Sequence, residues 1–328
     1  MKALVVGYGS IGKRHIDNLS SFPDVEILVY TRRKYDSFLR RKKCKILHSL
    51  EDCLNENPHI AILANVTSLH VKIAIKLANA GINLFIEKPL SNSIERVETL
   101  LKLVKKRKLV TLMGCNFRFH PCIKAIKKII SNNEIGRIIS VRVENGSFLP
   151  NWHPYEKYPN SYASREELGG GVVLTCIHEI DYLYWFFGNV KEVFSITGKF
   201  SDLKISAEDL SAALLRFQNN IIAEIHLDYF QSPPVRSCKI LGTDGTIYWD
   251  LDTNTVKMYN VKRKKWIEKL KLQNYNNNDM YIEELSHFLK SIKTKQKTIN
   301  SIEEGFRVLK IALAIKKSSK IKKVITIN

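Results

Sequence analysis

Short apolar runs alternate with amphipathic stretches up to about residue 114 of the chain. Runs rich in Val, Ile and Leu that are separated by helical stretches are typical of a parallel sheet with helices on both faces. We therefore expect a doubly wound α/β fold in this part of the chain. The expected strands lie at residues 3–7, 25–30, 60–65, 83–87 and 109–114.

The pattern changes at about residue 137, where longer stretches alternate between apolar and polar positions. Such alternation is typical of antiparallel strands with one buried face. Turns are expected at residues 218–220 and 242–245, because Asn and Gly tolerate positive φ angles. We expect an α+β domain with helices at residues 166–187, 280–292 and 302–317, and strands at residues 137–148, 190–200, 210–220, 221–230, 235–242, 246–252 and 255–261.

The composition is that of a globular protein with an excess of basic residues. Of the 328 residues, 52 are Lys or Arg and 32 are Asp or Glu, which gives a formal net charge of +20. A charge of this size raises the question of a nucleic acid or membrane partner. The lysines are spread over many segments, however, and no nucleic-acid-binding motif accompanies them. We therefore expect a solvated, lysine-rich surface, with no nucleic acid and no membrane as partner.

The cysteines and the N-terminus bear on the compartment of the protein. The six cysteines lie far apart without metal-binding spacing, so we expect reduced thiols and no metal site. The first apolar run is too short for a signal peptide, and no segment has the apolar length of a membrane span. We therefore expect a cytoplasmic protein.

A glycine fingerprint follows the first expected strand. The G-x-G-x-x-G motif opens an amphipathic helix and consists of Gly7, Gly9, Ser10, Ile11 and Gly12. Its first glycine permits a tight turn, its second lets a pyrophosphate approach the backbone, and its third lets helix and strand pack closely. The motif predicts a dinucleotide-binding Rossmann domain, which we place at residues 1–118, with the second domain at residues 119–328.

The end of the second strand bears on which dinucleotide binds. NAD-specific domains place an Asp or Glu there for the ribose diol, whereas this chain has Thr31, Arg32 and Arg33. Two guanidinium groups and a hydroxyl suit a 2′-phosphate. We favour NADP over NAD as the cofactor; the alternative is that both arginines are surface charges that discriminate weakly.

Two segments carry candidates for proton transfer. Lys88 follows an expected strand at its carboxyl end, where open α/β sheets bind ligands, and a lysine there can donate to a carbonyl or alcohol oxygen. His178 and Asp181 lie one helical turn apart, so that the carboxylate can orient the imidazole; a core histidine is the alternative. The zinc motif H-E-x-x-H would need a histidine where the chain has Tyr182.

These motifs together resemble the Gfo/Idh/MocA family of NAD(P)-dependent oxidoreductases, which act mostly on sugars, cyclitols and their nucleotide-linked forms. The resemblance covers nearly the whole chain. It implies a Rossmann domain followed by an α+β domain with a large open, mainly antiparallel sheet, whose face often forms the contact of a homodimer or homotetramer. The stretches that carry it are GYGSIGKRH, ANVTSLHVKIAIKLANAGINLFIEKPLS, GCNFRFHP, ELGGGVVLTCIHEIDYLYWFFG, AEDLSAALLRF and IEEGFRVLKIALAIKKSS.

The resemblance also implies roles for single residues. Lys88 matches the family's active-site lysine and His178 its acid/base histidine, while Asp181 matches a position often near substrate hydroxyls. Arg118 belongs to a pocket-lining N-x-R element and is expected to contact the substrate. Contacts to the cofactor are implied for Asn65, Thr67, His70, Glu87 and Asn116.

One position departs from the family pattern. Many members carry an Asp four residues before the histidine, where this chain has Leu174. Either Asp181 replaces the missing carboxylate in part, or Lys88 and His178 suffice. A hypothesis from another class is a dinucleotide-binding sensor or scaffold that has lost catalysis.

An aromatic and basic loop precedes the glycine run of the second domain. Residues 152–158 and 162–165 combine flat rings with hydrogen-bonding groups, which suits the C–H face and the hydroxyls of a sugar. A packed surface loop is the alternative. Fold-level analogy does not supply the particular sugar, the reaction direction or the stereochemistry. The residues of this loop that we expect to contact substrate are Trp152, Tyr158, Tyr162 and Arg165.

Overall fold

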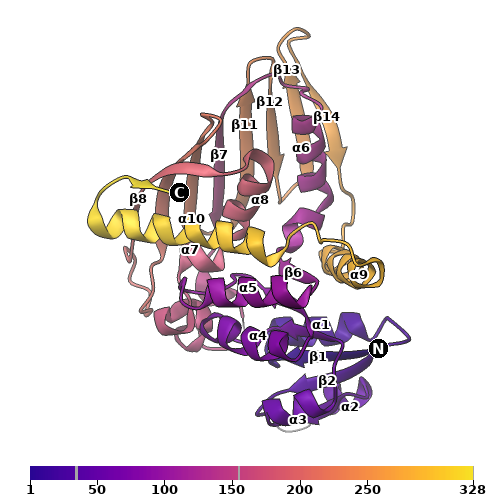
Figure 1. The fold of residues 1–328 in the computed structure, drawn as a ribbon. Helices are drawn as coiled ribbons and strands as arrows, with labels where there is room; N and C mark the ends of the chain where they lie inside the picture. The colour runs from indigo at the N-terminus through magenta and orange to yellow at the C-terminus, as the bar shows by residue number, and fades with distance from the viewer. Residues whose placement is uncertain (34–35, 154–155, 328) are drawn as a thin grey trace. The chain divides into compact units, whose positions relative to one another are not determined.

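The computed structural model describes residues 1–33, 36–153 and 156–327. The chain forms two compact units, each built from two segments (Figure 1). The N-terminal unit comprises Met1–Cys115 and Tyr281–Phe306, and the C-terminal unit comprises Asn116–Met280 and Arg307–Asn328. Within the described ranges, no helix combines the length and apolar character needed to cross a membrane.

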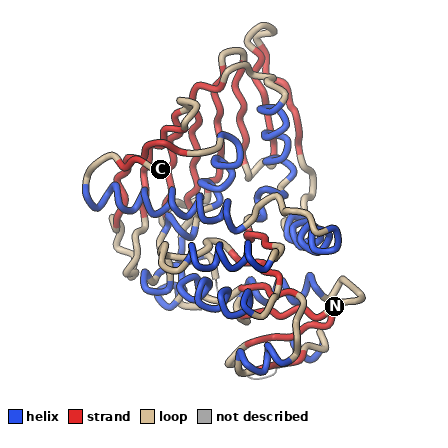
Figure 2. The backbone as a smooth tube through the Cα atoms, in the orientation of Figure 1, coloured by secondary structure: helices blue, strands red, loops and turns tan. Residues whose placement is uncertain are grey.

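The N-terminal unit contains a six-stranded parallel sheet in the order β3-β2-β1-β4-β5-β6. The predicted Rossmann fold is thereby confirmed. Its strands are β1 (Lys2–Val6), β2 (Glu26–Tyr30), β3 (Lys45–Leu47), β4 (Ile60–Leu63), β5 (Asn83–Glu87) and β6 (Thr111–Gly114). Its helices include α1 (Ser10–Leu19), α2 (Ser37–Arg41), α3 (Leu50–Asn55), α4 (His70–Asn79) and α5 (Val97–Arg107). Figure 2 shows strands in red and helices in blue.

The edge strand β3 was missing from the prediction. It has three residues, of which only Ile46 and Leu47 are apolar, so it is too short to stand out as an apolar run in the sequence. The strand that ends at Glu87 is consequently the fifth in chain order and not the fourth.

A distant segment completes the core of the N-terminal unit. Leu285 and Phe288, on helix α9 (Asn278–Thr294), are buried in one cluster with side chains of β1, β2 and β5. The ring of Phe288 packs edge-on against Phe85, with 5.8 Å between the ring centroids. The N–H of Met113 in β6 donates to the carbonyl of Asn300 at 2.8 Å. The unit is thus discontinuous in sequence, and the domain boundary after residue 118 stays a prediction.

The C-terminal unit contains a nine-stranded sheet in the order β14-β13-β12-β11-β7-β10-β9-β8-β15. Its neighbouring strands are antiparallel except for the parallel pair β7 and β10, so the expected, mainly antiparallel sheet is confirmed. Strands β14 and β15 were not predicted. The strands are β7 (Ile138–Gly146), β8 (Val190–Gly198), β9 (Leu210–Phe217), β10 (Ile222–Asp228), β11 (Val235–Gly242), β12 (Gly245–Asp250), β13 (Thr255–Asn260), β14 (Lys265–Lys271) and β15 (Ile325–Thr326).

The two faces of this sheet differ in burial, because successive side chains of a strand point to opposite faces. Helices α6 (Pro121–Ser131), α8 (His178–Phe187) and α10 (Ile302–Ile321) lie over one face (Figure 1). The buried row of paired residues consists of Val193, Leu215, Ala223, Val141, Ile240, Ile247 and Met258. On the other face, the row of Phe194, Leu214, Glu224, Arg142, Lys239, Tyr248 and Lys257 is largely exposed.

The helix expected at residues 166–187 is interrupted in the structure. A 3₁₀ turn at Glu166–Leu168 is followed by the short helix α7 (Val172–Thr175), and α8 begins at His178. Gly171 causes the break, because its φ of 100° lies in a region that other residues rarely adopt. A side chain on the neighbouring Gly170 would collide with the carbonyl of Tyr162. His178 therefore lies in the first turn of a helix and not in the middle of one.

Candidate active site

The fingerprint glycines form a tight turn between β1 and α1. Gly7 has a φ of 103°, and a Cβ there would lie 2.7 Å from the carbonyl oxygen of Ala64. A Cβ on Gly12 would collide with the carbonyl of Gly7, whereas a Cβ on Gly9 would meet nothing within 4 Å. Gly9 also caps the N-terminus of α1, which has no acidic residue in its first turn. The open backbone and the free helix end fit the pyrophosphate of a dinucleotide.

The loop after β4 lies beside this turn. The backbone nitrogen of Asn65 is 2.8 Å from the position that a Cβ of Gly7 would take. Asn65 donates from Nδ2 to the carbonyl of Val66 at 3.1 Å, and its buried Oδ1 has no hydrogen-bond partner among the described residues. Thr67 is buried in the 3₁₀ turn that follows. An unsatisfied buried acceptor at this edge fits a bound polar ligand.

The end of β2 presents the residues expected to select the cofactor. Thr31 is buried, and its Oγ1 accepts a hydrogen bond from the N–H of Arg33 at 3.1 Å. The ring of His48 lies 2.8 Å from the carbonyl of Thr31. Arg32 and Arg33 are exposed. The buried Thr31 is thus followed in the chain by two exposed arginines. The role of their guanidinium groups toward a 2′-phosphate stays a prediction.

The end of β5 presents Lys88 between two buried neighbours. Glu87 and Pro89 are buried, whereas Lys88 is partly exposed. The carboxylate of Glu87 lies 2.6 Å from Nε2 of His15, a residue of helix α1. The ring of His70 contacts the carbonyls of Asn65 and Pro89. Glu87 and His70 thus have protein partners here, and their expected contacts to the cofactor stay predictions.

In the C-terminal unit, Asp181 is held by Arg118. The guanidinium donates from Nε and from Nη2 to the two carboxylate oxygens, each at 2.9 Å. Both side chains are almost fully buried, with 0% and 1% of their surface exposed. Arg118 is therefore engaged in a bidentate pair within the protein. We expected Asp181 to orient His178 and Arg118 to contact the substrate. Both roles stay predictions, in addition to the observed pairing of the two residues.

His178 lies in a buried aromatic and charged cluster. Its ring contacts that of Phe117, with 5.0 Å between the centroids, and Phe117 in turn carries the guanidinium of Arg236 at 4.3 Å. Arg236 forms an ion pair with Glu179, with 2.8 Å between Nε and Oε1, and Asn145 donates from Nδ2 to Oε2 at 3.2 Å. Contacts with residues on β7 and β11 thus set the surroundings of the histidine.

Four of these partners were missed by the sequence analysis. Glu179 stands next to His178 and could have been noticed as a carboxylate in the first turn of its helix. His15, Asn145 and Arg236 carry no local signal, because their partners lie far away in the sequence.

Burial shifts the pKa values of several groups near these candidates. Burial lowers the pKa of His70 and, with a contribution from the Arg236 charge, that of His120 to about 4. It also raises the pKa of Tyr182 well above its usual range. These groups are therefore neutral near pH 7, which leaves them as hydrogen-bonding and packing groups.

The loop expected to contact substrate is partly packed against the C-terminal unit. Trp152 donates from Nε1 to Oγ of Ser147 at 2.8 Å, and its ring meets Tyr229 edge-on at 5.2 Å. The hydroxyl of Tyr158 accepts from the N–H of Lys204 at 3.2 Å. Tyr155 of the same loop lies outside the described residues. Tyr162 is partly exposed and Arg165 is exposed, so the loop's substrate contacts stay predictions.

Among the described residues, no three His, Cys, Asp or Glu side chains lie close enough together to hold a metal ion.

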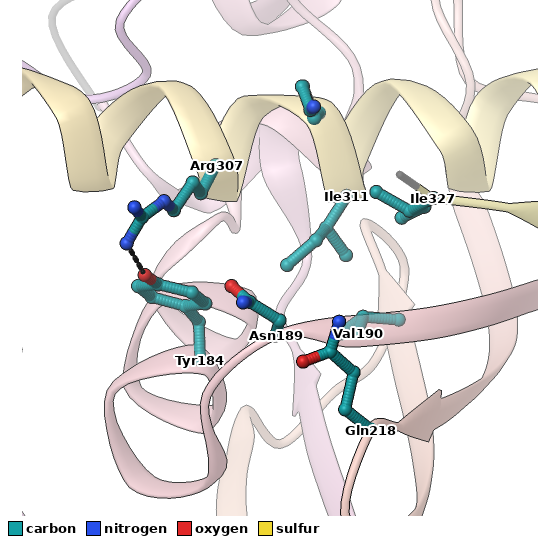
Figure 3. Close-up of a pocket in the computed structure, with 8 residues that line it drawn as sticks. Tyr184, Asn189, Val190, Gln218, Arg307, Ile311 and Ile327 are labelled. Carbon is teal, nitrogen blue, oxygen red and sulfur yellow. Dashed lines mark hydrogen bonds between the residues drawn. The ribbon is translucent and has the colours of Figure 1, made fainter.

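A hollow of about 210 Å³ in the C-terminal unit is lined by none of the predicted site residues (Figure 3). Its wall includes Arg307, which donates to the hydroxyl of Tyr184 at 2.9 Å.

Comparisons with known proteins identify the class. The model of an oxidoreductase family with an NAD-binding Rossmann fold matches residues 1–115, and that of the GFO/IDH/MocA C-terminal domain matches residues 123–248. The chain belongs to the Gfo/Idh/MocA family of NAD(P)-dependent oxidoreductases. The resemblance expected from the motifs is therefore confirmed.

Individual relatives span the whole chain. The chain is 26% identical to myo-inositol 2-dehydrogenase of Thermotoga maritima, over 97% of this chain and 96% of that protein. Its fold is similar to that of a levoglucosan dehydrogenase in complex with NADH, with a TM-score of 0.90 and 19% identity over 100% and 99% of the two chains. A myo-inositol 2-dehydrogenase from Lactobacillus plantarum matches with a TM-score of 0.83 and 22% identity over 100% and 99%.

The buried pair of Arg118 and Asp181 gives a first prediction. Arg118→Ala should lower the free energy of unfolding by about 3–5 kcal/mol, because it leaves a buried carboxylate without its counter-charge. Urea unfolding followed by tryptophan fluorescence measures the change. Arg165→Ala is the control, since its pair with Glu167 is exposed and should contribute about 1 kcal/mol or less. Equal effects of the two substitutions would contradict the importance assigned to the buried pair.

Proposed function

We propose that the protein transfers a hydride between a nicotinamide dinucleotide and a hydroxyl- or keto-bearing carbon of a sugar, a cyclitol or a nucleotide-linked sugar. The observation that carries this proposal is the open turn at Gly9, which lies at the same sheet edge as Lys88. A bound nicotinamide supplies the hydride chemistry. The relatives named above, which include inositol and levoglucosan dehydrogenases, support the substrate class.

Lys88 and His178 have complementary roles in the proposal. Lys88 donates a hydrogen bond from Nζ to the reacting oxygen of the substrate, and His178 accepts or returns the hydroxyl proton. Partial exposure of Lys88 supports its role, because the residue has accessible surface although its chain neighbours are buried. The role of His178 is supported by its place in the first turn of α8, where it is buried and its ring packs against Phe117.

The substrate wall in this proposal is formed by the loop residues and by the N-x-R element. Tyr162 and Arg165 have exposed surface available to a ligand. Trp152 and Tyr158 are fixed by hydrogen bonds to Ser147 and Lys204, so their rings offer rigid surfaces to a sugar. Asn116 and Arg118 begin the same unit and are both buried.

We further infer a homo-oligomer, dimer or tetramer, formed through the open face of the nine-stranded sheet. Exposed apolar side chains on this face, such as Phe194, Ile196 and Leu214, support it. Sedimentation velocity should show an assembly larger than the 37.8 kDa chain, and Leu214→Glu should shift it toward monomer. A monomeric wild-type protein at micromolar concentration would contradict this inference.

The preference for NADP is tested by titration. NADPH should bind about tenfold more tightly than NADH, because a 2′-phosphate gains charge-assisted hydrogen bonds from the exposed guanidinium groups. Arg32→Ala should remove most of that difference, and quenching of protein fluorescence measures both affinities. Arg107→Ala, at an exposed arginine of α5, is the control. Tighter binding of NADH would retain the oxidoreductase but contradict the role of Arg32 and Arg33.

The role of Lys88 is tested by turnover with a panel of sugars, cyclitols and nucleotide sugars. Lys88→Ala should lower kcat by about 10²–10⁴-fold, since it removes a proton donor, while the Kd of NADPH changes little. Lys76→Ala on the exposed side of α4 is the control. Full activity of the Lys88→Ala enzyme would remove this residue from the mechanism. Cofactor binding by the wild type without turnover on the whole panel would favour the sensor or scaffold.

A further inference from the structure

The corner formed by Glu87, Lys88 and Pro89 is held by two buried histidines from different helices. His15 of α1 binds the side chain of Glu87, and His70 of α4 contacts the carbonyl of Pro89. Both residues that flank the lysine in the chain are therefore fixed, while the lysine itself is partly exposed.

The contact between His15 and Glu87 lies in the apolar core of the N-terminal unit. His15 has no exposed surface, its Nε2 is 2.6 Å from Oε1 of Glu87, and its ring meets Phe85 edge-on at 5.0 Å. The carboxylate lies over Gly114 of β6, where a Cβ would be 2.9 Å from its Cδ. Loss of either partner would leave a buried polar group unsatisfied. The pair thus ties the end of β5 to the helix that carries Gly12.

His70 contacts two loops with its two ring nitrogens. Nδ1 lies 2.9 Å from the carbonyl of Pro89, and Nε2 lies 3.0 Å from the carbonyl of Asn65. Burial lowers the pKa of His70, so the neutral ring carries a single N–H near neutral pH. A neutral ring donates to only one of the two carbonyls at a time. The two contacts therefore require separate tests.

We propose that His15 and His70 are positioning residues that hold the backbone on either side of Lys88 and thereby place its Nζ atom. This rests on the proposed role of Lys88 in the reaction. A lysine side chain has several rotatable bonds, so its reach to a substrate oxygen depends on a fixed backbone. Misplacement of a reacting group by about 1 Å costs about 100-fold in rate.

Substitution of His70 by Asn or by Gln allows its two contacts to be tested one at a time. Asn brings its amide nitrogen near the position of ring Nδ1, and Gln brings it near Nε2. His70→Asn therefore retains the donor toward Pro89, whereas His70→Gln retains only the donor toward Asn65. If the contact between His70 and Pro89 positions Lys88, only His70→Gln should change the position of the lysine.

A matched pair of variants tests the contact between His15 and Glu87. His15→Gln retains a donor for Glu87, and His15→Leu removes it while filling the apolar site. His59→Gln is the control for both histidines. His59 also bonds a backbone group, accepting from the N–H of Lys2 at 3.1 Å, but it lies at the amino ends of the strands.

The measurement is pulse acetylation of the full chain with acetic anhydride, without substrate. Mass spectrometry gives the labelling of Lys88 relative to that of Lys102, an exposed lysine of α5. His70→Gln and His15→Leu should change this ratio about threefold or more, the effect of one lost hydrogen bond. His70→Asn, His15→Gln and His59→Gln should stay within about twofold of wild type. In His70→Gln, kcat should fall while KM and the Kd of NADPH stay near their wild-type values.

Two results would overturn the proposal. One is an unchanged labelling ratio in His70→Gln with a native circular dichroism spectrum. The other is an unchanged ratio with weaker NADPH binding in both His70 variants, which would make His70 a cofactor ligand. An unchanged ratio in a folded His15→Leu protein would remove His15 from the proposal. If His15→Leu does not fold, the two His70 variants still decide the role of His70. A changed ratio together with full turnover of Lys88→Ala would support the positioning contacts and contradict the proposed reaction, so the two failures are distinguishable.

Discussion

The parallel register of β1, β4 and β5 is the constraint on which the candidate site of the N-terminal unit depends. Val6 lies beside Leu63, and Leu63 lies beside Ile86, so the chain leaves all three strands at one edge of the sheet. The strands are held there by almost complete burial of their side chains. A shift by one residue would exchange the side chains that pack on the two faces of the sheet and would move the strand ends relative to one another. The same register places the loop after Leu63 beside the fingerprint turn and Glu87 within reach of α1.

In the C-terminal unit, two buried ion pairs restrict the conformation of the chain around His178. Asp181 with Arg118 and Glu179 with Arg236 are pairs in which a fully buried carboxylate is bound by an arginine. Taking such groups out of water costs free energy, and a well-packed apolar pair is often as stable. A charged pair tolerates few alternative geometries, however, because an unpaired partner is strongly destabilising. The two pairs therefore fix the first turn of α8, where His178 lies, more narrowly than apolar packing would.

Local patterns in the sequence were sufficient for the fold class but not for the partners of buried polar groups. Apolar runs separated by helical stretches gave the Rossmann sheet, and alternating stretches gave the second sheet. The three-residue β3 has too few apolar positions to be recognised, and Gly171 breaks a helix whose apolar pattern continues across it. The fingerprint turn was predictable because its residues are adjacent in sequence. The bond from Arg118 to Asp181 spans 63 residues, and no local signal encodes it.

The interrupted helix bears on Leu174, which stands where many family members carry an Asp. Leu174 is buried in α7, before the break, and α8 begins only at His178. The two carboxylates that follow His178, at Glu179 and Asp181, are each compensated by an arginine. Each of these carboxylates therefore already has a cationic partner within the protein. Of the two alternatives for the missing Asp, these pairings favour the one in which Lys88 and His178 suffice for the proposed proton transfer, and the role of Asp181 stays a prediction.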